Sequence, residues 1–193
     1  MDDVAVALEQ EQRIPLTAVV LVPPEAAWAP IQAIRRAHDP QYVRWMPHVT
    51  LLYPFVPAAR LADAAERLRP AAASVEPFDV SFAAFGHFEH GGRSVTLWLR
   101  PEPAEAVRQL QAGLEAAMPW CDDVSGFPGG FTPHLSVGRF PTVAEAERVA
   151  ASLLASWRPV EFRAAEVALI ARSGAPGDPF RVAFTLPLGA SMG

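Results

Sequence analysis

The feature that most restricts the fold of this chain is the order in which strand-like and helix-like segments follow one another. Apolar, β-branched runs bounded by Pro or Gly predict strands, and apolar residues three to four positions apart predict helices. We expect strands at residues 14–22, 48–53, 78–85, 94–99, 131–138, 160–171 and 180–187. We expect helices at residues 25–38, 58–74, 102–118 and 142–157. Strands that alternate with helices but also follow one another directly are typical of an α+β protein.

The predicted order contains the same unit twice. Strand-helix-strand-helix-strand covers residues 14–85 and again residues 94–171. The pattern therefore predicts a bilobed, duplicated fold, with two mixed or antiparallel sheets, helices outside, and a central groove between pseudo-symmetric lobes. A single domain is expected over residues 1–193, with residues 1–12 as a flexible or weakly helical lead-in and residues 172–188 as a closing strand.

Composition narrows the classes of function. All 16 basic residues are Arg, so the chain lacks the Lys of a Walker A loop, a Schiff base or a covalent nucleotidyl-lysine. The net charge of −5 argues against a grip on duplex nucleic acid, which requires a basic surface. A small nucleotide or an RNA terminus is the favoured partner.

The sequence carries no mark of a membrane or secreted protein. No apolar run reaches the length of a spanning helix, and the acidic start does not fit a secretory signal. Cys121 is the only cysteine, so an intrachain disulfide is excluded. We expect this thiol to be buried. We expect a cytoplasmic protein with no membrane partner, and the sequence leaves its oligomeric state open.

Two of the predicted strands repeat one pattern. Residues 47–51 read Pro-His-Val-Thr-Leu, and residues 133–137 read Pro-His-Leu-Ser-Val. Because side chains alternate along a strand, each pattern places an imidazole and a hydroxyl on one face, about 7 Å apart, and aliphatic groups on the other. Since 15 of 193 residues are Ser or Thr, a hydroxyl two places after a given His is expected about one time in thirteen. Two cases among five histidines are uncommon, although ordinary packed histidines remain the alternative.

This set of side chains suits chemistry at phosphorus. One neutral His can take a proton from water, and a second, protonated His can give one to the leaving oxygen. The candidate pair is His48 and His134. Thr50 and Ser136 can donate hydrogen bonds to the nonbridging oxygens. This chemistry requires no metal and no other cofactor.

Extended to residues 46–55 and 132–139, the two patterns resemble the paired motifs of the 2H phosphoesterase superfamily, and especially its 2′-5′ RNA ligase and cyclic nucleotide phosphodiesterase members. The resemblance spans residues 14–188. It implies a bilobed fold whose motifs face a central groove, and opening of 2′,3′-cyclic phosphates of RNA ends or nucleotides, or of cyclic phosphates of ADP-ribose, without a metal. Some members join RNA 2′-5′ in reverse. It makes His48 and His134 the acid–base pair and Thr50 and Ser136 the phosphate ligands; Ser136 stands where Thr is common.

Two arginines are further candidates for substrate binding. Arg139 follows the second motif, where its guanidinium can hold a phosphate or ribose, and a bridging role on the surface is the alternative. Arg172, with Ser173 beside it, ends a late strand and is a candidate for the groove mouth.

Aromatic residues near the motifs are candidates for stacking on a base. Phe55 follows the first motif and is the one we assign to substrate binding. Trp45 and Phe131 have the same potential, with core packing as the favoured interpretation for each aromatic. Strict alternation places Tyr53 with the buried aliphatic residues.

Three alternatives stay open. His87 and His90 are interpreted as exposed loop residues, although with His38 or Glu89 they could suggest a metal site, and a metal-dependent phosphoesterase is the weaker hypothesis. The groove could also bind a nucleotide or RNA end without turnover. The sequence does not decide which of the paired histidines is the base.

Overall fold

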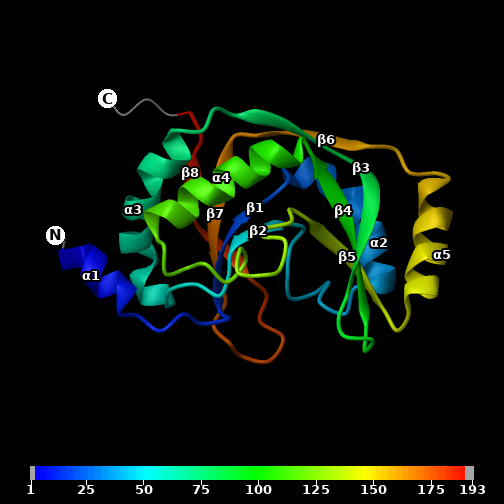
Figure 1. The fold of residues 1–193 in the computed structure, drawn as a ribbon, viewed down its shortest axis with the longest axis horizontal. Coiled ribbons are helices and arrows are strands. Elements are labelled where there is room, and N and C mark those ends of the chain that lie inside the picture. Colours follow the sequence, from blue (N-terminus) through cyan, green and yellow to red (C-terminus); the bar gives the residue numbers. More distant parts are fainter. Residues whose placement is uncertain (1–2, 190–193) are drawn as a thin grey trace.

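The structure, a computed structural model, describes residues 3–189 as two four-stranded antiparallel sheets with helices packed against them (Figure 1). The first sheet has the order β2 (Val49–Leu52), β1 (Thr17–Leu21), β7 (Glu166–Ala171) and β8 (Arg181–Pro187). The second has the order β5 (Leu135–Phe140), β4 (Val95–Glu102), β3 (Phe78–Glu89) and β6 (Val160–Ala164). The predicted α+β architecture is confirmed, and every strand pairing is antiparallel.

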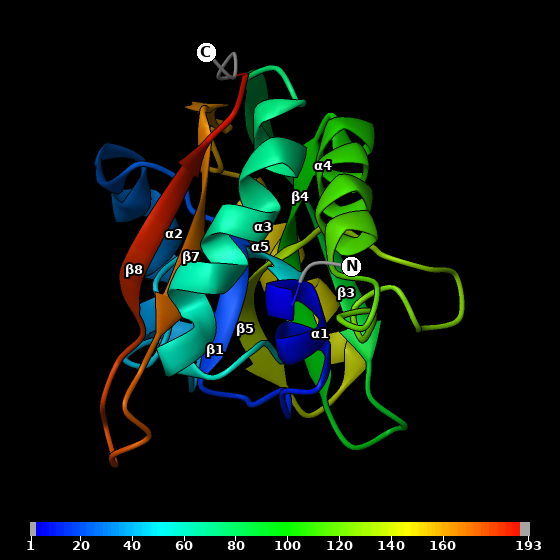
Figure 2. The same cartoon turned by 90° about the vertical axis from the view of Figure 1, so that its left-hand side faces the viewer.

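The helices cover both sheets. They are α1 (Asp3–Glu9), α2 (Trp28–His38), α3 (Leu61–Ala73), α4 (Ala104–Ala117) and α5 (Val143–Leu154), with short 3-10 turns before α2 and α3. Figure 2 shows α3 and α4 side by side, and α3 also packs on β8. At the start of α5, the Thr142 hydroxyl caps the helix by accepting a hydrogen bond of 3.2 Å from the Glu145 amide. Within residues 3–189, none of the helices has the length and apolar character needed to cross a membrane.

The two sheets have equivalent orders, with a histidine-motif strand at one edge of each. The third strand of each repeated unit crosses to the other sheet: β3 pairs with β4, and β7 pairs with β1. Each sheet therefore combines strands from residues 14–85 and from residues 94–171. The single strand predicted at residues 160–171 is two strands, β6 and β7, that belong to different sheets. The chain passes between them at Ala165, and no Gly or Pro marks this break in the sequence.

Both motif strands contain a β-bulge at the same place. Thr50 and Leu52 of β2 pair with two consecutive residues of β1, so β2 has one extra residue between them. Ser136 and Gly138 of β5 likewise pair with two consecutive residues of β4, so β5 has one extra residue between them. The extra residue follows the motif hydroxyl in both strands, which is further support for a duplicated fold.

The bulge changes which face the following residues occupy, because an extra residue shifts the alternation by one. Strict alternation placed Tyr53 on the core side, and that prediction is wrong. Tyr53 packs instead with Trp45 against a small cluster on the opposite face of the first sheet, which includes Val20 and Phe180.

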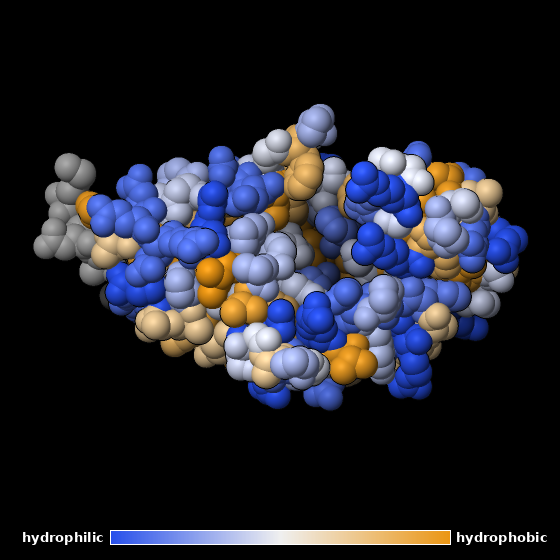
Figure 3. All heavy atoms as spheres, turned by 90° about the horizontal axis from the view of Figure 1, so that it is seen from below, coloured by the Kyte–Doolittle hydropathy of each residue, from blue (hydrophilic) through white to orange (hydrophobic). Residues whose placement is uncertain are grey.

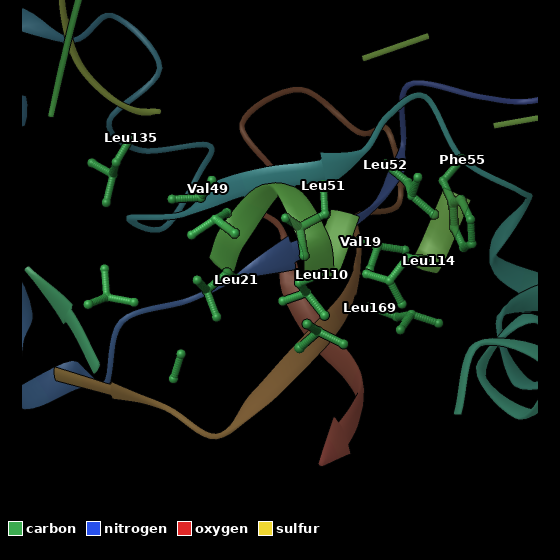
Figure 4. Close-up of a cluster of buried hydrophobic side chains, with 14 of the residues drawn as sticks. Val19, Leu21, Val49, Leu51, Leu52, Phe55, Leu110, Leu114, Leu135 and Leu169 are labelled. Atoms are coloured by element: carbon green, nitrogen blue, oxygen red, sulfur yellow. The ribbon is translucent and has the colours of Figure 1, made fainter. Parts of the chain in front are cut away.

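One hydrophobic core joins the two sheets. The aliphatic residues of both motifs, Val49, Leu51, Leu135 and Val137, are fully buried in it, as the pattern predicts. Figure 4 shows Val49 and Leu51 from β2 pointing into the same interior as Leu110 from α4. The core thus fixes the faces of β2 and β5 that do not carry the histidines.

Phe55 belongs to this core and not to a substrate site. Its side chain is fully buried, and its backbone forms a bridge with Ile14 in which each amide donates to the other residue's carbonyl, at 3.2 and 2.7 Å. The assignment of Phe55 to substrate binding is therefore wrong: after the bulge and Pro54 the chain turns this ring inward. Within the expected lead-in, residues 3–9 form α1, and Leu8 is fully buried in the same core.

We expect Leu51→Ala to lower the free energy of unfolding by about 2–5 kcal/mol, because it leaves a cavity in the shared core beneath the motif strand. Leu154→Ala is the matched control, since Leu154 is 56% exposed, and it should change stability by less than about 0.5 kcal/mol. Chemical denaturation of the two variants and the unaltered protein makes the comparison. Equal effects of the two substitutions would contradict this assignment of the core.

Candidate active site

The two motif histidines lie at equivalent places, each one residue before an edge strand. His48 precedes β2 and His134 precedes β5, and these two strands of different sheets are in contact. Figure 3 views the molecule from the side on which the β3–β4 and β7–β8 turns project in Figure 1, and this face is hollowed between two masses of atoms. The topology therefore brings distant segments of the chain to one place.

Both imidazoles are held in the same way. His48 Nδ1 lies 2.7 Å from the Met46 carbonyl oxygen, and His134 Nδ1 lies 2.9 Å from that of Thr132. Because a carbonyl can only accept, Nδ1 must carry the proton in each ring. In the neutral ring, Nε2 is then the free, basic nitrogen. Each His thus has one nitrogen fixed by the backbone and the other available for proton transfer.

His48 sits beside an aromatic stack. Its ring lies 4.6 Å from the Trp45 ring at an angle of 16°, and Trp45 stacks in turn on Phe180 at 3.8 Å. Burial lowers the pKa of His48 to about 4, and repulsion from the charges of Arg35 and His134 acts in the same direction, while the hydrogen bond to the Met46 carbonyl opposes it. His48 is therefore neutral at pH 7.

His134 has an aromatic neighbourhood of its own. The centre of the Phe88 ring lies 4.8 Å from that of the imidazole, with the two rings nearly perpendicular, and the centre of the Trp98 ring lies 6.1 Å away. Burial lowers its pKa, the hydrogen bond to the Thr132 carbonyl raises it, and repulsion from His90 lowers it. The charge of His134 also lowers the pKa of His48, so the two imidazoles interact electrostatically.

A cavity of about 200 Å³ lies between segments of the two motifs. Its lining includes Arg35, Trp45, His48, Thr96, Ser136 and Arg139. The structure therefore brings the first-motif histidine together with the second-motif hydroxyl. His134 and Thr50 are half-buried and lie outside this lining.

Arg139 reaches the cavity because of the bulge in β5. Without the extra residue, it would share a face with Leu135 and Val137. With it, Arg139 lines the cavity beside Ser136, and its Nε and Nη2 donate to the Ser94 hydroxyl at 3.2 and 2.9 Å. These bonds leave Nη1 of the guanidinium to donate to an anion in the cavity.

Arg172 lies farther along the same face of the first sheet. Its guanidinium carbon is 5.6 Å from the centre of the Phe180 ring, and its buried Nε has no hydrogen-bond partner in the described part of the chain. A chain of ring contacts through Phe180 and Trp45 links Arg172 to His48. Ser173 is committed elsewhere, since its amide and hydroxyl both donate to Asp178 at 2.6 Å.

Sequence reasoning did not single out Arg35 and Thr96, and it favoured a core role for Trp45. Arg35 looked like an ordinary helix residue, yet it is 2% exposed, ion-paired to Asp39 at 2.8 Å, and part of the cavity lining. The sequence feature that could have indicated a place for Trp45 in the site is its position three residues before His48. Phe131, the other aromatic candidate, is half-buried against the main core.

The remaining titratable candidates lie outside the cavity lining. His87 is within β3 and not in a loop as predicted, while His90 is exposed with its Nε2 2.8 Å from the Thr96 hydroxyl. Burial raises the pKa of the Cys121 thiol to about 12, which makes it a poor nucleophile. Across residues 3–189, we find no group of three or more His, Cys, Asp or Glu side chains arranged to hold a metal ion.

Related proteins include two from bacteria that carry the provisional name phosphoesterase. The one from Geobacillus kaustophilus is 28% identical over 123 residues, 63% of this chain and 67% of that protein. The one from Oceanobacillus iheyensis is 26% identical over 122 residues, 63% of this chain and 68% of that protein.

Solved structures share the fold at low sequence identity. A Thermus thermophilus protein matches with a TM-score of 0.64 and 21% identity, covering 91% of this chain and 99% of its own. Apo LigT of Escherichia coli matches with a TM-score of 0.59 and 20% identity, covering 93% of this chain and all of its own. The family model described as the 2′-5′ RNA ligase superfamily matches residues 23–176, which include both histidine motifs. The chain thus belongs to the 2′-5′ RNA ligase superfamily.

Proposed function

We propose that this protein is a metal-independent phosphodiesterase that opens 2′,3′-cyclic phosphates of RNA ends or nucleotides, or the cyclic phosphate of ADP-ribose. Family membership and the names of its relatives support phosphoesterase activity in general. The observation that carries the finer proposal is the matched pair of imidazoles, each with Nδ1 fixed by a backbone carbonyl and Nε2 left free. Binding alone would not need two such groups.

In the proposed reaction, one imidazole takes a proton from water as the water oxygen bonds to phosphorus. The bond from phosphorus to one ribose oxygen breaks, and the second imidazole gives that oxygen its proton. The product is a phosphate monoester, and both histidines end in exchanged protonation states that solvent restores. Thr50, Ser136 and Arg139 are proposed to hold the nonbridging oxygens as charge develops on them.

The environments of the two rings favour one assignment of roles. His48 has a pKa of about 4 and is therefore the better-prepared base at neutral pH. His134 is the remaining candidate for the acid. When the 5′-hydroxyl of a second RNA replaces water, the same groups run the joining reaction, so 2′-5′ ligation is a proposed side activity.

Structures of Escherichia coli LigT have been solved with phosphate and with 3′-AMP. We propose that the corresponding cleft of this chain accepts ligands of the same class. Arg172, with its unpartnered Nε close to Phe180, is proposed to contact parts of the substrate that extend toward the β7–β8 turn.

The first test is turnover of a panel of 2′,3′-cyclic nucleotides, a cyclic-phosphate-ended RNA and ADP-ribose cyclic phosphate in EDTA, with the monoester identified by chromatography. We expect turnover, and we expect His48→Ala and His134→Ala each to reduce kcat/KM by at least about 100-fold while circular dichroism stays unchanged. His87→Ala, a strand histidine outside the cavity, is the matched control. Tight binding of cyclic nucleotides without any product would favour a non-catalytic binding module instead, and activity lost only in EDTA would indicate a metal-dependent enzyme.

A second test concerns the motif hydroxyl at position 136. Ser136→Ala should lower kcat by about 100-fold, because it removes one hydrogen-bond donor to the charged oxygens. Ser136→Thr keeps the hydroxyl and should retain most of the activity. Similar losses in both variants, measured under saturating substrate, would indicate a steric role for this position and not hydrogen bonding.

The lowered pKa values of both histidines predict an acid-shifted pH profile. The base is available once pH exceeds about 4, where His48 becomes neutral. The acid is lost as His134 deprotonates, which happens below the ordinary imidazole value of 6.5. Because kcat/KM reports the free enzyme, we expect a bell-shaped curve with its maximum below pH 6.5. A maximum on the alkaline side of neutrality would argue against these roles.

A further inference from the structure

A second, more open cavity adjoins the one that contains His48. Its volume is about 550 Å³, and it shares Asp39, Pro40 and Arg139 with the first. Beyond Arg139 it continues along the last turn of α2, where Arg36 and His38 line it. The two cavities therefore follow one another along the junction of α2 with β5.

The charge of this second cavity is positive. Arg36 and Arg139 line it, and Asp39 is the one acidic residue in its lining. Both oxygens of Asp39 are occupied: one accepts from Arg35 Nε at 2.8 Å and the other from the Gln41 amide at 2.8 Å. The carboxylate is thus neutralised by a buried guanidinium, which leaves the positive groups to act on a ligand. In a protein of net charge −5, such a local concentration of arginine favours an anion at this place.

Both arginines have donors to spare. Arg36 is exposed, and its Nε and Nη2 are 3.4 and 3.3 Å from the Tyr42 hydroxyl, at the long limit for hydrogen bonds. Arg139 uses Nε and Nη2 on Ser94, which leaves Nη1. A phosphate between them could receive hydrogen bonds from both guanidinium groups.

The wall between the arginines is built by close packing of α2 on β5. A Cβ atom on Gly138 would lie 2.9 Å from the Cβ of His38, so only glycine allows the helix end to approach the strand this closely. The ring of His38 also packs against Phe140, with centroids 5.4 Å apart. This contact sets the position of the α2 end, and with it Arg36, relative to Arg139.

We infer that this second cavity is a binding subsite for the phosphodiester group one nucleotide before the reacting cyclic phosphate. The inference rests on the proposed function, because it assumes that the cyclic phosphate occupies the His48 cavity. It assigns the substrate class: an oligonucleotide end with at least two phosphates is preferred over a mononucleotide. Arg139 then contacts both phosphates, and Arg36 contacts the second one alone.

The test compares a dinucleotide that ends in a 2′,3′-cyclic phosphate with the matching cyclic mononucleotide. For Arg36→Gln, the ratio of the two kcat/KM values should fall by about fivefold, the scale of one exposed charge-assisted hydrogen bond. Arg148→Gln, an exposed arginine on α5, is the control and should leave the ratio unchanged. Calorimetry then gives the ratio of the association constants of the two phosphate monoester products, a measurement that does not require turnover.

The two readouts separate the two proposals. A fall of both ratios in Arg36→Gln supports the subsite and the phosphodiesterase function together. A fall in the binding ratio without turnover of either substrate by the unaltered protein would keep the subsite and remove the catalytic proposal. Turnover with ratios that Arg36→Gln does not change more than Arg148→Gln does would overturn the subsite and keep the catalytic proposal.

Discussion

The site depends on the burial of aliphatic side chains from two edge strands in one common core. Val49 and Leu51 on β2 and Leu135 and Val137 on β5 are fully buried, so each strand has only one way to face. Because burying such side chains stabilises the fold by kilocalories each, the opposite face must carry the imidazole and the hydroxyl. The strands touch, and the polar faces are thereby held near one another.

The paired bulges refine this arrangement. An extra residue after the hydroxyl lets β5 place a third side chain, Arg139, beside Ser136, and lets β2 place Tyr53 on its polar side. A strand without a bulge would bury an arginine or expose a leucine at these points. In both halves of the duplicated fold, the residues on the histidine-bearing face therefore follow one another at intervals of two and then three positions. In the first motif they are His48, Thr50 and Tyr53, and in the second they are His134, Ser136 and Arg139.

The two similar histidines lie in different electrostatic surroundings. In both rings Nδ1 donates a hydrogen bond to a backbone carbonyl. The charges of the buried Arg35 and of His134 lower the pKa of His48, whereas the charge of His90 lowers the pKa of His134. The same Arg35 also pairs with Asp39 and so offsets the negative charge of a carboxylate that lines both cavities. One ion pair thus contributes to the pKa of the candidate base and to the charge of the groove.

The local sequence pattern was enough to predict most helices and strands, the buried aliphatic faces and the two histidine motifs. The reason is that alternation and helical spacing are properties of neighbouring residues. It did not reveal that β3 and β7 exchange sheets, since pairing partners lie far apart in the chain and the break at Ala165 has no turn residue. It misplaced Tyr53 and left the direction of Phe55 open, because a bulge is defined by the partner strand. Arg35 and Arg36 gained their place in the groove only when α2 packed on a strand about a hundred residues away, a contact that long-range packing alone decides.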